Sequence, residues 1–131
     1  MTEHRENTGS IHRLPETELT VMKIIWKNGE NVSSDTVVSS FCEYKKWERP
    51  AILTLLKRLE AKGFVKSRKE GKMNTYTPLV AEKDYLEFEG KNFLKNLYGN
   101  SVKRFVASLY DGKSISKEDL EELKRFIEEA E

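Results

Sequence analysis

The stretch from Trp47 to Gly63 constrains the fold of this chain more than any other stretch. Its apolar residues recur at i, i+3, i+4 and i+7, the spacing of one face of an α-helix: Ile52, Leu55, Leu56 and Leu59. Pro50 just inside the start and Gly63 just past the end are typical of helix termini. We therefore expect a helix over residues 49–62, with one face on a core and the other open.

Basic residues are concentrated around this helix, although the whole chain has a formal net charge of only +1. Residues 45–72 hold ten Lys and Arg against three Asp and Glu, a local net charge of +7, whereas residues 81–131 hold nine against twelve. A local patch, and not the overall charge, is what binds phosphates. The helix is therefore a candidate DNA recognition helix.

The flanking segments complete a winged helix-turn-helix pattern. Two helices are expected before the recognition helix, one from Pro15 to Asn28 and one from Ser33 to about Tyr44. After Gly63 the pattern changes to short strands at 64–69 and 73–79, joined by a Gly-centred turn. The expected fold class is mainly α with a small β hairpin. Three helices followed by a hairpin is the order of a winged helix-turn-helix domain, in which the third helix fits the major groove of B-DNA.

Three parts are expected along the chain: a flexible N-terminal arm at 1–13, a winged-helix DNA-binding domain at 14–80 and a C-terminal helical dimerisation domain at 81–131. The last part carries three amphipathic stripes that need an apolar surface to bury against. Burial in a twofold-related partner is favoured over folding back on the winged domain. The expected dimerisation residues are Leu86, Phe93, Leu94, Leu97, Val102, Phe105, Val106, Leu109, Leu120, Leu123 and Ile127. Ser116 and Asp119 have the spacing of a capping box.

Several separated motifs resemble the BlaI/MecI family of penicillinase and methicillin-resistance repressors. They are the stretches 18–26, 47–65 and 76–80, with 91–94 and 115–123 similar to the family's dimerisation arm. The resemblance covers about residue 14 to the end of the chain. It implies a homodimeric winged-helix repressor that binds a palindromic DNA operator and is inactivated when a membrane sensor protease triggers its cleavage.

The resemblance also places the family's base-reading residues, in the exposed N-terminal part of the third helix, at Ala51, Leu53 and Thr54. Thr54 matches the usual threonine, whereas Pro50, Ala51 and Leu53 stand where relatives carry Lys, Thr and a basic residue. Ala51 and Leu53 can contact a thymine methyl but cannot make a bidentate hydrogen bond to guanine, so the family's operator sequence is not expected to apply. The alternative that Leu53 is an exposed aliphatic residue with no role in DNA binding stays open.

The expected phosphate contacts come from the basic patch and the hairpin. They are Lys45, Lys46, Arg49, Lys57, Arg68, Lys69, Lys72 and Asn74. Arg58 matches an Arg-Leu dipeptide of the family. Instead of contacting phosphate, it could form an ion pair with an acidic residue of the same domain. Trp26 and Trp47 are expected to pack on the core.

Two features of the family differ in this chain. The bond cleaved in relatives joins Asn to Phe, and Ser108-Leu109 stands at that place, which argues against induction by a sensor-linked protease; Asn92-Phe93 belongs to another motif. The related copper-responsive repressors carry a C-terminal cysteine cluster, whereas the single cysteine here, Cys42, is expected to be a packing residue. Copper sensing through such a cluster is excluded.

Other classes of function are disfavoured. No apolar run approaches the ~18 residues that span a bilayer, the N-terminus lacks a secretory signal, and one cysteine fits a reducing compartment, so the expected location is cytoplasmic. Nor is there a Gly-rich phosphate loop, a nucleophile motif or zinc-ligand spacing; His4 and His12 are expected at the surface. We expect no enzyme, metal or cofactor. The alternative is a winged-helix protein-interaction or assembly module without specific DNA binding.

Overall fold

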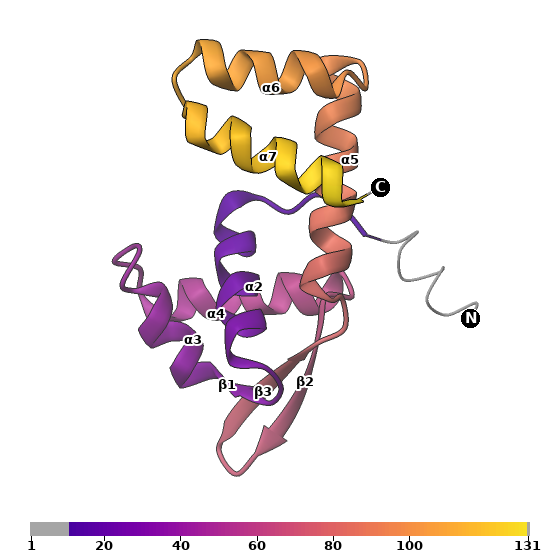
Figure 1. Ribbon diagram of the computed structural model, residues 1–131. Helices are drawn as coiled ribbons and strands as arrows, with labels where there is room; N and C mark the ends of the chain where they lie inside the picture. The colour runs from indigo at the N-terminus through magenta and orange to yellow at the C-terminus, as the bar shows by residue number, and fades with distance from the viewer. Residues whose placement is uncertain (1–10, 131) are drawn as a thin grey trace, which may run out of the picture. The chain divides into compact units, whose positions relative to one another are not determined.

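The computed structural model describes residues 11–130, which form six helices and a small sheet (Figure 1). The helices are α2 (Glu16–Asn28), α3 (Ser34–Phe41), α4 (Arg49–Ala61), α5 (Glu82–Tyr98), α6 (Val102–Asp111) and α7 (Lys117–Ala130). The strands are β1 (Val32–Ser33), β2 (Val65–Glu70) and β3 (Met73–Pro78). The contacts divide the chain into two compact units, one ending at Glu89 and the other beginning at Gly90. The expected fold class is confirmed.

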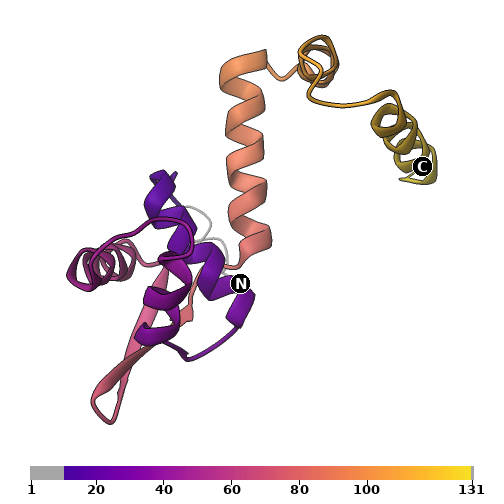
Figure 2. The same ribbon diagram turned by 90° about the vertical axis from the view of Figure 1, so that its left-hand side faces the viewer.

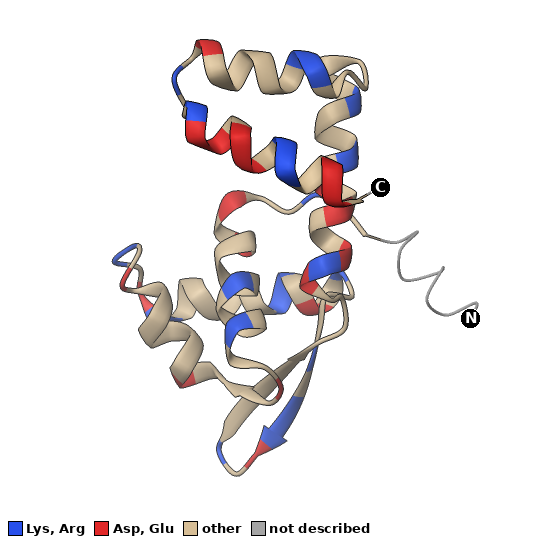
Figure 3. Cartoon of the chain, viewed as in Figure 1, with Lys and Arg blue, Asp and Glu red and all other residues tan. Residues whose placement is uncertain are grey.

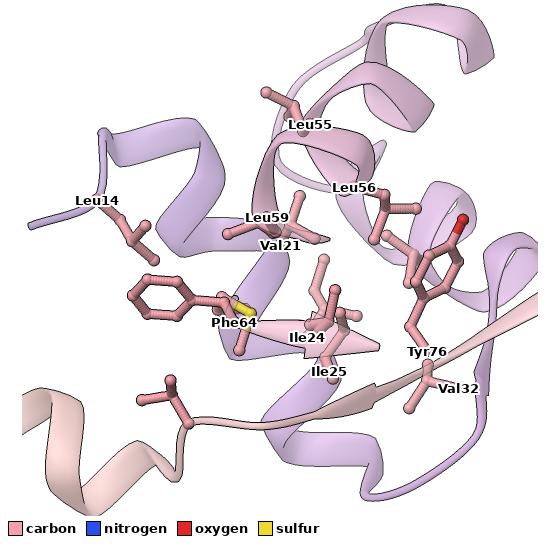
Figure 4. Packing of buried hydrophobic residues seen from close by; sticks show 14 of the residues in the cluster. Leu14, Val21, Ile24, Ile25, Val32, Leu55, Leu56, Leu59, Phe64 and Tyr76 are labelled. Atoms are coloured by element: carbon pink, nitrogen blue, oxygen red, sulfur yellow. The ribbon is translucent and has the colours of Figure 1, made fainter. Parts of the chain in front are cut away.

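The core of the first unit is built on the apolar face predicted for the third helix. Ile52, Leu56 and Leu59 of α4 are fully buried, and Leu55 is nearly so. Figure 4 shows Leu59 beside Val21 of α2, with side chains from α2, α4 and the sheet converging on one cluster. Burying an aliphatic side chain of this size stabilises the fold by about 1.5–3 kcal/mol. The orientation of α4, and with it the choice of exposed face, is therefore fixed by burial.

The helix before α4 begins as predicted and ends earlier. Ser33 is the N-cap of α3, and its side chain accepts a hydrogen bond from the backbone N–H of Thr36. The helix ends at Phe41, and in the turn that follows, the backbone N–H groups of Tyr44 and Lys45 both donate to the carbonyl of Phe41. The connection to α4 packs on the core through Trp47, whose ring centroid lies 5.3 Å from that of Phe41. Trp47 therefore contacts the core through Phe41 but is itself 36% exposed, so the packing role expected for it is met only in part.

The sheet is antiparallel, in the order β1-β3-β2. Val32 of β1 and Ser67 of β2 both pair with Tyr76 of β3. The β2–β3 hairpin extends beyond α2, α3 and α4 of the same unit (Figures 1 and 2). The sequence pattern predicted the hairpin but not β1, because two residues are too few to show a strand's alternation.

The first part of α5 packs in the same unit as the winged helix. Tyr85 is fully buried, and its ring centroid lies 5.9 Å from Trp26 and 5.8 Å from Phe64. Its hydroxyl accepts a hydrogen bond from the backbone N–H of Leu14 and donates one to Glu89, at 2.8 and 2.7 Å. Burial raises the pKa of Tyr85 from its ordinary value of 10.0 to about 12. The division between units consequently falls within α5, whereas the sequence pattern places the domain boundary after residue 80.

The expected N-terminal arm lies largely outside the described residues, which begin at Ile11. Its described end is packed, since Ile11 and Leu14 are both buried in the core cluster. Arg13 lies 3.7 Å from Glu89 in an ion pair.

The second unit contains the end of α5 with α6 and α7. The rings of Phe93, Tyr98 and Phe105 contact one another, with centroids 5.2–6.0 Å apart. The capping box at the start of α7 is confirmed: the backbone N–H of Ser116 donates to Asp119 Oδ2, and that of Asp119 donates to Ser116 Oγ. Nevertheless, neither α6 nor α7 has a buried residue. None of the helices in residues 11–130 is both long and apolar enough to cross a membrane.

Candidate nucleic-acid interface

One face of α4 points away from the core. Pro50, Thr54, Lys57 and Ala61 recur at i, i+4, i+7 and i+11, and all four are exposed. This row lies opposite the buried row of Ile52, Leu55, Leu56 and Leu59, so it is the part of α4 that can enter a groove. Thr54 and Lys57 occupy its middle.

The three residues expected to read bases differ in their exposure. Ala51 and Thr54 are exposed as predicted. Leu53 is not: it is half-buried and packs against the core cluster. Its position three residues before the buried Leu56 places it at the edge of the apolar face. The expectation of an exposed Leu53 is therefore wrong, and only part of its side chain remains available to a ligand.

The hydroxyl of Thr54 is already used as a donor. Its Oγ1 donates to the backbone carbonyl of Pro50 at 3.0 Å. What remains for a base is the acceptor capacity of the oxygen and the side-chain methyl. These suit an amino group of adenine or cytosine and the methyl of thymine in the major groove.

The hairpin sorts its polar residues onto two faces. Lys69 and Asn74 are directly opposite each other in the register of β2 and β3, and the alternation of side chains puts them on the same face as the core residue Tyr76. Lys66 and Arg68 lie on the other face by the same alternation. Lys72 follows Gly71 in the turn. Gly71 has a φ of 66°, a backbone conformation that suits glycine. Figure 3 shows basic residues on both α4 and β2.

The lysines and arginines of the patch differ in their partners. Within residues 11–130, the exposed Lys45, Lys46, Lys57, Lys69 and Lys72 take part in no ion pair, and neither does Arg58. The acid partner considered for Arg58 is thus not found. Arg49 instead pairs with Asp35 at 2.8 Å, and Arg68 pairs with Glu70.

One residue pair that positions α4 was missed by the sequence pattern. Lys62, the C-cap of α4, forms an ion pair with Glu18 of α2, whose side chain is only 3% exposed. Glu18 shares a helix face with the buried Met22 and Ile25, at i, i+4 and i+7. An acidic residue on an apolar helix face could have predicted a buried ion pair. Glu18 also fits the first turn of a helix, where acidic residues are common, so the pattern did not single it out.

Groups of three or more His, Cys, Asp or Glu side chains that could hold a metal ion are absent from the described part of the chain. Cys42 is half-buried, packs against the core cluster, and directs its Sγ toward the backbone carbonyl of Trp47 at 3.5 Å. The packing role expected for Cys42 is consistent with this position.

Comparison with known proteins identifies relatives that match most of the chain. The family model described as penicillinase repressor matches residues 14–129. The penicillinase repressor of Bacillus licheniformis is 32% identical over 119 residues, which cover 91% of this chain and 92% of that protein. The methicillin resistance regulatory protein MecI of Staphylococcus aureus (strain N315) is 28% identical over 88% of this chain and 94% of its own length. Among solved structures, the DNA-binding domain of the repressor BlaI is 36% identical with a TM-score of 0.51, covering 56% of this chain and 88% of that one.

Proposed function

Because this chain belongs to the penicillinase repressor family, we propose that it represses transcription as a homodimer, with the two α4 helices in successive major grooves of a palindromic operator. The observation that carries this proposal is the exposed row of α4, which belongs to a domain like that of BlaI and is flanked by lysines that form no ion pair within residues 11–130. Ala51 and Thr54, with the accessible part of Leu53, are the proposed base contacts. The proposed phosphate contacts are the residues expected from the sequence: Lys45, Lys46, Arg49, Lys57, Arg68, Lys69, Lys72 and Asn74. A transcriptional repressor must have access to the chromosomal DNA, and we therefore propose that this protein is located in the cytoplasm.

Exposed apolar side chains in the second unit support the proposal of a dimer. Leu97, Val102 and Ile127 are exposed large apolar side chains, and the partly buried Leu120 and Leu123 extend the stripe of α7. Exposed apolar side chains gathered on one helical element are typical of an interface. A second copy of the same arm would bury them, and the dimerisation residues expected from the sequence remain our proposal.

The inducing event is proposed to differ from cleavage at the family's position. Ser108 and Leu109 lie within α6, where the backbone is hydrogen-bonded as a helix. The sequence there also lacks the Asn-Phe pair. A sensor-linked protease acting at this bond is therefore not part of the proposed mechanism.

Replacing Thr54 with alanine is expected to reduce discrimination among operators. The change removes the acceptor oxygen and the methyl from the middle of the exposed row. A base contact that is not bidentate is expected to be worth about 1 kcal/mol, or roughly fivefold, in the ratio of specific to non-specific affinity. The measurement is the affinity for a selected operator and for single-base variants of it. An unchanged ratio at every position would remove Thr54 from the base contacts.

Replacing Lys69 with alanine is expected to weaken all duplexes alike and to lower the slope of log affinity against log salt by about 0.9, the value of one phosphate contact. The matched control is Lys66→Ala, because Lys66 is also exposed on β2 but lies on the opposite face of the hairpin. The control should keep the wild-type slope. Equal effects of the two substitutions would show that the hairpin acts only through its total charge.

The proposed function as a whole is tested by selecting genomic fragments with the purified protein and measuring affinity against salt. A palindromic fragment bound about 10³-fold or more tightly than a scrambled one is expected. A folded dimer that ignores both duplexes would instead favour the protein-interaction module.

A further inference from the structure

Arg49 is expected to contact DNA phosphate, yet it already forms an ion pair with Asp35 of the same chain. Arg49 is the first residue of α4, and its Nη1 lies 2.8 Å from Asp35 Oδ1. Its Nη2 donates to Ser34 Oγ at 3.3 Å. Ser34 and Asp35 are the first two residues of α3, so the guanidinium joins the N-terminal turns of the two helices that form the helix-turn-helix.

We propose that Asp35 holds the charge of Arg49 in an intramolecular ion pair and thereby limits how strongly the interface binds the DNA backbone. The inference rests on the proposed function and concerns the regulation of that same surface. Asp35 would act through Arg49, as a positioning residue, and would not itself contact DNA.

The exposure of the pair is what makes it relevant to DNA. The Arg49 side chain is 47% exposed and that of Asp35 58%, so a phosphate can reach the guanidinium while the carboxylate stays nearby. Asp35 and Ser34 occupy two donor atoms of the guanidinium, which leaves further N–H groups free. An arginine that is already neutralised releases fewer counterions from DNA than a free one, and its carboxylate partner repels the phosphate.

A purely structural role explains Asp35 less well. The N-terminus of α3 is capped by Ser33, whose side chain accepts the hydrogen bond from Thr36. An exposed ion pair contributes little to stability compared with the burial of an apolar core of this kind. The effect of the pair should therefore be visible in DNA binding and hardly at all in folding.

The test compares wild type, Asp35→Asn, Arg49→Met and the double variant. Asparagine keeps the acceptor oxygen facing Arg49 and removes only the charge. Affinity is measured for a selected palindromic duplex and a scrambled one across a range of salt concentrations, and thermal unfolding is followed for each protein. We expect Asp35→Asn to tighten binding to both duplexes by roughly threefold near 0.15 M salt and to steepen the salt slope by up to about 0.9. With Arg49→Met in place, the same change should alter affinity by less than about twofold.

The possible outcomes separate the inference from the proposed function. Weaker or unchanged binding by Asp35→Asn would overturn the inference alone, and so would a gain that persists in the Arg49→Met background, because Asp35 would then repel phosphate without acting through Arg49. If wild type bound no duplex in a salt-dependent way, the proposed function would fall and the inference with it. A melting temperature of Asp35→Asn far below wild type would also contradict the inference, because it would assign Asp35 a structural role.

Discussion

Replacing Ile127 with aspartate is expected to make the protein monomeric and to weaken operator binding by about a hundredfold. Ile127 lies on the apolar stripe of α7, is exposed in the single chain, and is proposed to be buried by the second copy. A carboxylate in that position would have to be desolvated without a partner. Once the arms separate, the two recognition helices no longer bind as a linked pair, and linkage of this kind is worth about 10²–10⁴-fold. Sedimentation and operator affinity are the measurements.

The matched control places the same side chain on the other face of the same helix. Arg125 is exposed and lies almost opposite the stripe formed by Leu120, Leu123 and Ile127. Arg125→Asp should remain dimeric. A dimeric Ile127→Asp variant, or a monomer with undiminished operator affinity, would contradict the proposed arrangement.

Replacing Lys62 with methionine is expected to lower the free energy of unfolding by about 2–3 kcal/mol. The substitution keeps most of the apolar stem but leaves the carboxylate of Glu18 in the core without its partner. Removing one member of a buried pair typically costs about 3–5 kcal/mol, and we expect the lower value because the Lys62 side chain is 33% exposed, so water can reach the site. Chemical denaturation measures the effect.

The surface pair of Lys83 and Glu87 supplies the control for this prediction. Those side chains are 84% and 64% exposed, and Lys83→Met should leave the free energy of unfolding nearly unchanged. Combining Lys62→Met with Glu18→Gln should recover much of the lost stability, because no buried charge then remains. If Lys62→Met cost no more than Lys83→Met, the pair would not be holding the end of α4 against α2.

The recognition helix shows how much of the fold can be predicted from local pattern. The apolar repeat of Ile52, Leu55, Leu56 and Leu59, bounded by Pro50 and Gly63, predicted both the helix and its buried face, because burial and backbone preference act within a few turns. The same reasoning located the hairpin and the capping box of α7. It overestimated the exposure of Leu53, since the width of a buried face depends on what packs against it.

The sequence by itself determined the order of helices and hairpin, the clustering of basic charge and the family resemblance, all of which depend on residue type and spacing along the chain. Only the tertiary structure decided which basic residues of the described part of the chain form ion pairs. Asp35 meets Arg49, and Glu18 meets Lys62, across separations in sequence that no periodic pattern encodes. Tyr85 likewise joins the start of α5 to the core through Leu14 and Trp26. Charge pairing and packing of this kind depend on distances in space, and those distances exist only once the apolar faces have brought the helices together.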